Sequence, residues 1–167
     1  MQLPKRKPGK YASIEQDRHL TASAIERLKA TLRDLEERQR PKAVEDMRTA
    51  AEMGDRSDNA AYSEARWRLT GIDSRIFSLN ERIKYAIPIE EGVSPGGRAR
   101  IGSTVVVSVN GQEKTYQILG PQETSPGRGR ISHLSPLGEL LMNRKAGESV
   151  TLRVNGKDTE YRIVGVK

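Results

Sequence analysis

The sequence predicts an α+β fold in which a long antiparallel α-helical hairpin precedes a small antiparallel β-sheet domain with one short helix. Two coiled-coil patterns, separated by a short glycine-containing connector, predict the hairpin. A strand–Asn-Gly–strand pattern that occurs twice in the C-terminal half predicts the sheet. A Pro/Gly-rich linker over residues 88–98 separates the two parts.

Composition narrows the class of protein. The chain has 167 residues and a net charge of +7, which suits a polyanionic partner, although a basic soluble protein without such a partner fits the charge equally well. The lack of cysteine excludes disulfide bonds and thiolate metal sites. No apolar run reaches the length of a membrane span, and none follows the basic N-terminus as in a secretory signal. We therefore expect a cytoplasmic protein with a flexible basic tail over residues 1–20.

The coiled coil is predicted over residues 21–87. Its first helix begins after Thr21, whose hydroxyl can cap the first turn. Pro41 lacks an amide hydrogen and should kink this helix. The first seam consists of Ile25, Leu28, Leu32 and Leu35. The seam is expected to resume on a shifted register at Val44, Met47 and Ala51.

The second helix has an unbroken seam with alternating spacings of three and four residues. It consists of Tyr62, Ala65, Leu69, Ile72, Ile76, Leu79, Ile83 and Ala86. Each arm has roughly 30 residues, which makes a rod of about 45 Å. The connector at its tip, residues 54–59, reads GDRSDN and contains two aspartates. On this pattern alone, Asp55 and Asp58 fit helix N-caps as well as a functional site.

The β-sheet domain is predicted over residues 99–167. VSVNGQEKTYQILG and LRVNGKDTEYRIVG each read as two alternating strands joined by Asn-Gly, which suits a type I′ turn. Between them, a short helix should begin after Ser135, take Pro136 as its first residue and end at Gly147. The apolar residues of this helix should face the sheet; they are Leu137, Leu140 and Leu141.

The chain also contains GDRSDNAAY followed by RLTGIDSRI, Arg40-Pro41 ahead of the tip, YQILG and SPLGELLMNRKAGESV. Together, these motifs resemble the GreA/GreB family of bacterial transcript cleavage factors, with the GreB branch slightly closer. The resemblance covers about residues 20 to 167 and implies an FKBP-like C-terminal domain. It implies that the partner is RNA polymerase, whose secondary channel the coiled coil enters. A backtracked polymerase then cleaves its own extruded RNA 3′ end, so the factor is an accessory and not an enzyme by itself.

The resemblance also assigns roles at the tip. Asp55 and Asp58 correspond to acidic residues that help the polymerase to hold a catalytic Mg²⁺ and a water. Gly54 and Asn59 would shape the turn, and Ser57 would contact the polymerase. Because Mg²⁺ is often held by only one or two protein carboxylates, two aspartates suit an ion shared with the polymerase and not bound stably by this chain alone.

Two tip residues depart from the family pattern. Asp58 stands where the family usually has the longer Glu, and Ala61 stands where it usually has an acid. A displacement of about 1 Å can cost about 100-fold in rate. The alternative is therefore a non-cleaving Gre-like homologue that docks in the same channel and inhibits or modulates transcription. A third alternative is a coiled-coil adaptor unrelated to transcription.

Several features outside the tip leave two interpretations open. Arginines at seven-residue intervals beside the seams could face RNA or simply solubilise the coiled coil. The candidates for contact with RNA are Arg33, Arg40, Arg68 and Arg75. Trp67 and Phe77 are expected to be packing or covering residues rather than base-stacking platforms, and His133 a surface or packing residue. The protein is expected to be a monomer.

Overall fold

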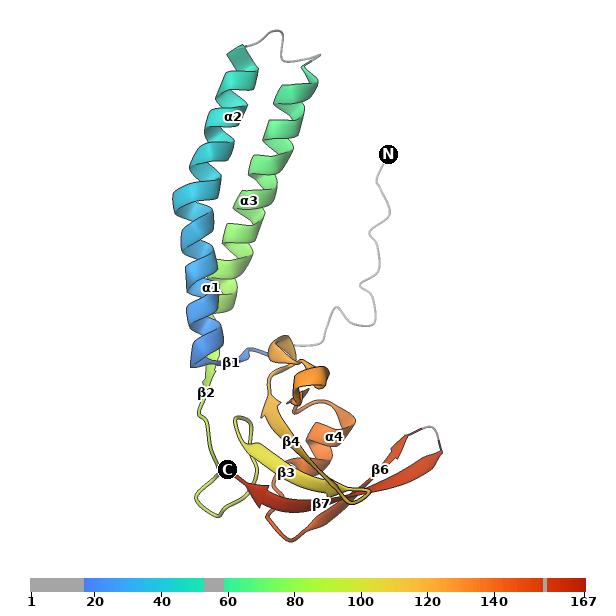
Figure 1. Cartoon of the computed structure of the whole chain (residues 1–167). Coiled ribbons are helices and arrows are strands. Elements are labelled where there is room, and N and C mark those ends of the chain that lie inside the picture. The colour runs from blue at the N-terminus through green and yellow to red at the C-terminus, as the bar shows by residue number, and fades with distance from the viewer. Residues whose placement is uncertain (1–16, 53–58, 155) are drawn as a thin grey trace, which may run out of the picture.

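The computed structural model describes residues 17–52, 59–154 and 156–167, with a rod of two antiparallel helical arms standing on a β-sheet domain (Figure 1). The first arm contains α1 (Ala22–Asp34), a π-helical turn η1 (Leu35–Gln39) and α2 (Arg40–Glu52). The second arm is the single helix α3 (Ala60–Lys84). The predicted α+β class and the order of its two parts are confirmed.

The seam of α3 is confirmed along the helix. Ala65 and Leu79 are buried, and the other seam residues from Tyr62 to Ala86 are half-buried. Most residues between them are exposed, as expected for a helix that packs along one face only. At the start of α1, the Thr21 hydroxyl accepts a hydrogen bond from the Ala24 amide at 3.1 Å, which confirms the predicted cap.

The first arm differs from the prediction after Leu35. The buried positions beyond it are Ala43 and Ala50. Of the predicted seam residues, Met47 and Ala51 are half-buried, whereas Val44 is 37% exposed, so the predicted register is wrong at Val44. The Arg40 amide donates to the Leu35 carbonyl, five residues back, as in a π-helix. This turn adds one residue, so the seam moves from Leu35 to Ala43 in eight residues rather than seven. The interruption expected at Pro41 is thus a widened turn directly before it, and the helix continues.

A small parallel sheet at the base of the rod was not predicted. Strand β1 (His19–Thr21) pairs with β2 (Ile87–Ile89), which joins the start of the first arm to the end of the second. Leu20 is only 2% exposed. Residues 17–20 therefore belong to the fold and not to the predicted tail, and β2 occupies the start of the predicted linker. The rest of the tail, residues 1–16, lies outside the described residues.

The C-terminal sheet has the strand order β5-β4-β3-β7-β6. Its strands are β3 (Thr104–Val109), β4 (Gln112–Leu119), β5 (Arg130–Ser132), β6 (Ser149–Val154) and β7 (Lys157–Val166). Both predicted hairpins are confirmed, with Val109 paired to Gln112 across one turn and Val154 to Lys157 across the other. Asn110 and Gly111 have the positive φ angles, 51° and 77°, that the turn requires. Only β5 departs from the antiparallel prediction, because it runs parallel to β4.

The short helix α4 (Pro136–Leu141) has the predicted cap, with the Ser135 hydroxyl accepting from the Gly138 amide at 3.1 Å. Its predicted end at Gly147 is wrong, because the chain leaves the helix after Leu141. Asn143 takes a left-handed conformation, and its amide donates to the Ala99 carbonyl at 2.8 Å. This pairing with Ala99 replaces the hydrogen bonds that would continue the helix.

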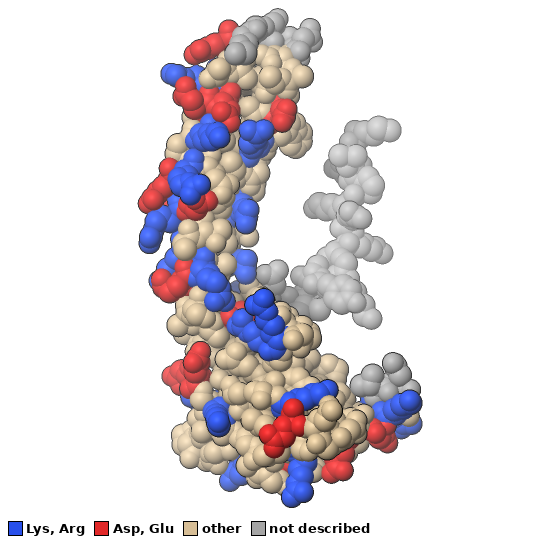
Figure 2. Space-filling model, viewed as in Figure 1, with Lys and Arg blue, Asp and Glu red and all other residues tan. Residues whose placement is uncertain are grey.

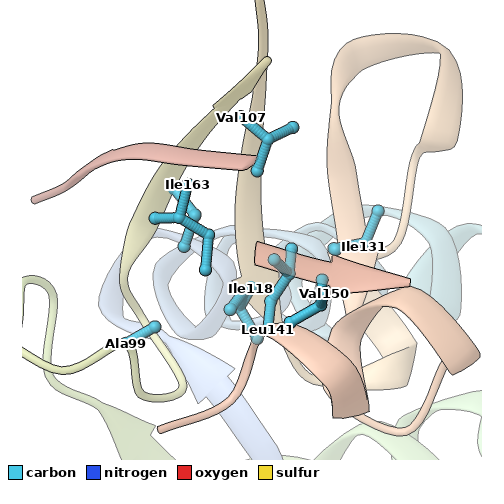
Figure 3. Close-up of a cluster of buried hydrophobic side chains, with 8 residues drawn as sticks. Ala99, Val107, Ile118, Ile131, Leu141, Val150 and Ile163 are labelled. Atoms are coloured by element: carbon cyan, nitrogen blue, oxygen red, sulfur yellow. The ribbon is translucent and has the colours of Figure 1, made fainter. Parts of the chain in front are cut away.

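The main hydrophobic core lies between the sheet and α4 (Figure 3). Leu141 is fully buried, and Leu137 and Leu140 pack beside it, which confirms the predicted face of α4. Tyr116 and Tyr161 also pack against this core. The buried cluster consists of Ala99, Val105, Val107, Ile118, Ile131, Leu141, Val150 and Ile163.

Candidate functional site

The two arms of the rod are joined at the tip by the side chain of Asn59. Its Oδ1 accepts a hydrogen bond from the Tyr62 amide at 3.0 Å, which makes Asn59 the N-cap of α3. Its Nδ2 donates to the Ala50 carbonyl of α2 at 2.6 Å. One amide side chain therefore caps one arm and binds the last turns of the other. Sequence alone suggested the aspartates of the tip as N-caps of the second helix. In the structure, the N-cap of α3 is Asn59.

The other predicted tip residues lie outside the described residues. They are Gly54, Asp55, Ser57 and Asp58. The structure describes the helix ends that carry them, Glu52 of α2 and Ala60 of α3. Ala61, in the first turn of α3, is exposed. Within the described residues, no group of three or more His, Asp or Glu side chains could hold a metal ion.

The four candidate arginines of the rod fall into two pairs. Arg40 forms an ion pair with Asp73 of the opposite arm at 2.8 Å. Arg68 reaches Asp46 across the arms and Glu64 on its own helix, both at 3.3 Å. By contrast, Arg33 and Arg75 are exposed and form no ion pair within the described part of the chain. Two of the candidates thus tie the arms together, and two are available to a partner.

Charges of both signs are mixed along one face of the rod. On the face that Figure 2 shows, Lys and Arg are interspersed with Asp and Glu over the helices. The cross-arm pairs of Arg40 and Arg68 account for part of this pattern. Since such pairs are solvent-exposed, each contributes about 0–1 kcal/mol to stability.

The two aromatic side chains outside the seam of α3 are strongly exposed. Trp67 is 78% exposed and Phe77 is 70% exposed. The prediction that they pack against or cover the coiled coil is therefore wrong. Both project from the face of α3 that points away from the seam, because neither follows its three-and-four spacing.

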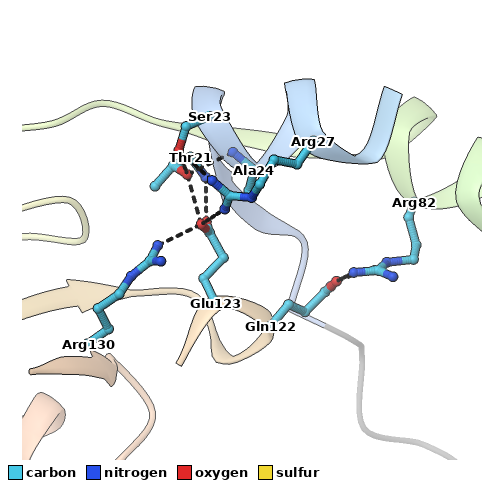
Figure 4. A network of polar contacts seen from close by, with 8 residues as sticks. All are labelled: Thr21, Ser23, Ala24, Arg27, Arg82, Gln122, Glu123 and Arg130. Carbon is cyan, nitrogen blue, oxygen red and sulfur yellow. Dashed lines mark hydrogen bonds and ion pairs between the residues drawn. The ribbon is translucent and has the colours of Figure 1, made fainter. Parts of the chain in front are cut away.

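A buried carboxylate joins the rod to the sheet domain (Figure 4). Glu123, at the end of the 3₁₀ turn η2 (Pro121–Glu123), has a side chain that is 4% exposed. It accepts hydrogen bonds from the Thr21 amide at 2.6 Å and the Thr21 hydroxyl at 2.8 Å. Arg130 approaches the same carboxylate at 2.9 Å and Arg27 at 3.4 Å. Sequence analysis missed this residue, because Glu123 lies in no recognisable motif and its partner Thr21 is 102 positions away.

A second polar cluster fixes the base of the rod. Asp17 contacts His19 through one carboxylate oxygen and His133 through the other, each at 3.0 Å. The two imidazole rings meet edge to face with their centroids 5.8 Å apart. His133 is half-buried and connects β1 to the loop after β5. Beside these, Gln122 accepts from Arg82 of α3 at 2.7 Å, so both arms contact the sheet domain.

Comparison with known proteins follows the same division of the chain. The family model described as "Transcription elongation factor, N-terminal" matches residues 18–87. The model described as "Transcription elongation factor, GreA/GreB, C-term" matches residues 94–167. Together they span the rod, its base and the sheet domain.

Individual relatives are GreA proteins. The chain is 34% identical to the transcription elongation factor GreA of Treponema pallidum over 88% of this chain and 92% of that protein. It is 35% identical to GreA of Thioalkalivibrio sulfidiphilus over 89% of this chain and 96% of that one. The GreB-like subtype stays a prediction.

Similar solved structures include that of Gfh1 from Thermus aquaticus. It is 26% identical to this chain, with a TM-score of 0.42, and the match covers 91% of this chain and 99% of that one. A GreA/GreB factor of Nitrosomonas europaea is 19% identical with a TM-score of 0.40 over 89% and 97%. Among the helices of the described residues, none is both long and apolar enough to cross a bilayer. From its family models and GreA relatives, the chain belongs to the GreA/GreB family of transcription elongation factors.

Proposed function

We propose that this chain binds RNA polymerase, inserts its coiled-coil tip into the secondary channel and stimulates cleavage of backtracked RNA by the polymerase's own centre. Family membership supports the first part, and the shape of the molecule supports the rest. As part of the same proposal, the factor acts as a monomer in the cytoplasm. It is an accessory to the polymerase and not an enzyme by itself.

One observation carries the proposal: a single rod places Glu52 and Ala60, the helix ends on either side of the segment with Asp55 and Asp58, far from the sheet domain (Figure 1). Helix α3 has 25 residues, which correspond to a length of about 37 Å. The Asn59 side chain holds both arms together next to this segment. A carboxylate delivered over this distance can reach a site enclosed by another protein.

Asp55 and Asp58 would hold Mg²⁺ jointly with the polymerase. Two-metal hydrolysis of a phosphodiester uses such an ion to activate the attacking water and to stabilise the leaving oxygen. Two carboxylates fit the oxygen ligands that Mg²⁺ prefers, but they leave most of its six positions to water or to the partner. The donor set therefore suits a site completed within the complex.

A second candidate function is docking in the same channel without cleavage. The exposed Ala61 favours it, because this position at the start of α3 offers no carboxylate. The shorter Asp58 favours it as well, since its carboxylate reaches about 1 Å less than that of Glu. Both candidates share the binding of polymerase and differ only in the chemistry at the tip.

The test is RNA cleavage in stalled, backtracked elongation complexes with the purified protein. Under the first proposal, Asp55→Ala abolishes cleavage and leaves binding to polymerase unchanged. Glu37→Ala is the matched control, because this exposed carboxylate lies in η1, away from the tip. Binding without cleavage by the parent protein would establish the second candidate, and failure to bind would refute both. Faster cleavage by Asp58→Glu would show that the reach of this carboxylate limits the rate.

A further inference from the structure

We propose that the exposed ring of Trp67 is a stacking platform for a base of single-stranded RNA, with Arg66 binding an adjacent phosphate. The inference rests on the proposed function for the source of the RNA, which is the 3′ segment extruded from a backtracked polymerase. The side chains that would bind the RNA belong to the described part of α3.

Trp67 borders a pocket of about 410 Å³ on the outer face of α3. Pockets that bind small molecules measure roughly 300–1,000 Å³, so the space suits a nucleobase. The ring is 78% exposed, which leaves its face free for stacking. The lining residues that the structure describes come from the first turns of α3, next to the tip: Tyr62, Ser63, Arg66, Trp67 and Thr70.

The charges around the pocket favour an anionic ligand. Arg66 is exposed and forms no ion pair with any residue of the described ranges. The nearby Glu64 is engaged by Arg68 at 3.3 Å, which offsets its charge. An aromatic face beside an unpaired guanidinium is the combination that binds single strands without reading their sequence.

Phe77 provides a comparison on the same helix. It is nearly as exposed as Trp67, at 70%. One turn before it lies Asp73 and one turn after it lies Glu81, so both neighbours along the helix are acidic. Asp73 is engaged by Arg40 at 2.8 Å, but Glu81 forms no ion pair within the described residues and would repel a phosphate backbone. The structure thus distinguishes two exposed aromatic residues by their surroundings and assigns RNA only to Trp67.

The experiment uses the fact that Trp67 is the only tryptophan of the chain, so its fluorescence reports on this pocket alone. The full-length protein is titrated with a short single-stranded oligouridylate, and binding is also measured by anisotropy of the labelled RNA. RNA should quench the fluorescence of Trp67. Trp67→Ala should weaken binding by about 5- to 150-fold, the range expected for the loss of one base stack. Trp67→Phe should retain most of the affinity.

The controls separate this inference from the proposed function. Phe77→Ala should bind RNA like the parent protein, and Arg66→Gln should bind more weakly with a reduced dependence on salt. Equal RNA affinity of Trp67→Ala and the parent protein, or no quenching by RNA, would overturn the inference. Loss of cleavage in Asp55→Ala with quenching intact leaves the inference standing.

A protein occupant is the competing explanation. The variant Trp67→benzoylphenylalanine carries a photoreactive group at the platform. In stalled complexes it should cross-link to the RNA. Cross-linking to polymerase alone would show that the ring docks against protein, and this result would overturn the inference whatever the outcome of the cleavage assay.

Discussion

Replacing Glu123 with alanine should destabilise the junction between the rod and the sheet domain. The Glu123 carboxylate accepts two hydrogen bonds from Thr21, which is also the N-cap of α1. It also neutralises Arg130, whose Nε is buried without a hydrogen-bond partner. Glu123→Ala would leave the buried Thr21 amide and the partly buried Arg130 guanidinium without this acceptor.

The size of the effect follows from burial. Removing one partner of a buried ion pair costs about 3–5 kcal/mol, because the other charge stays buried and unpaired. Arg27, the third partner, is 61% exposed and adds little. The Arg130 side chain is 29% exposed, which lowers the penalty, so we expect a loss of about 3 kcal/mol. Glu123→Gln keeps an acceptor for Thr21 and should lose about half as much.

Urea unfolding followed by circular dichroism measures this loss. Since the long helices lie in the rod, the helical signal shows whether the rod unfolds separately once the junction is weakened. Gln122→Ala is the matched control, because its contact with Arg82 is exposed, and its effect should stay below about 0.5 kcal/mol. A free energy of unfolding for Glu123→Ala within about 0.5 kcal/mol of the parent value would refute the assigned role.

Three further variants test other parts of the fold. Asn59→Ala should lower the thermal stability of the rod by about 1–2 kcal/mol, measured by circular dichroism, and an unchanged midpoint would contradict the clamp between the arms. Gly138→Ala should cost about 1–3 kcal/mol, because its Cβ would overlap the Ser132 carbonyl, whereas Gly127→Ala, with open space around it, should cost far less. A double-mutant cycle on Arg40 and Asp73 should give a coupling of about 0.2–1 kcal/mol that weakens in high salt, and additive effects would rule out a cross-arm contribution.

Sequence predicted those elements whose signals are local. The seam of α3 repeats every three or four residues, so its buried face could be read without knowledge of the partner arm. The Asn-Gly turn at Asn110 was predictable for the same reason, because only a few residue types adopt its backbone conformation. Ser135 and Thr21 were likewise recognised as caps from their position before an apolar pattern.

The features that were missed depend on contacts between distant segments. The strands β1 and β2 have three residues each, and neither forms without the other. Glu123 acquires its role only when Thr21 is brought beside it. The register after Leu35 was wrong because the extra residue of a π turn leaves no trace in composition. At the tip, sequence identified Asn59 as a turn residue but not as the side chain that joins the arms.

The π turn at Leu35–Gln39 also determines the direction in which the distal half of the first arm faces. An α-helix turns by about 100° per residue, so one residue more or fewer rotates everything beyond it by this angle. Winding the same residues as uninterrupted α-helix would therefore swing Ala43 and Ala50 out of the interface, whereas deleting one residue from this turn would restore the seven-residue spacing and keep both in it. The π turn η1 therefore determines which face of α2 packs against α3 near the tip.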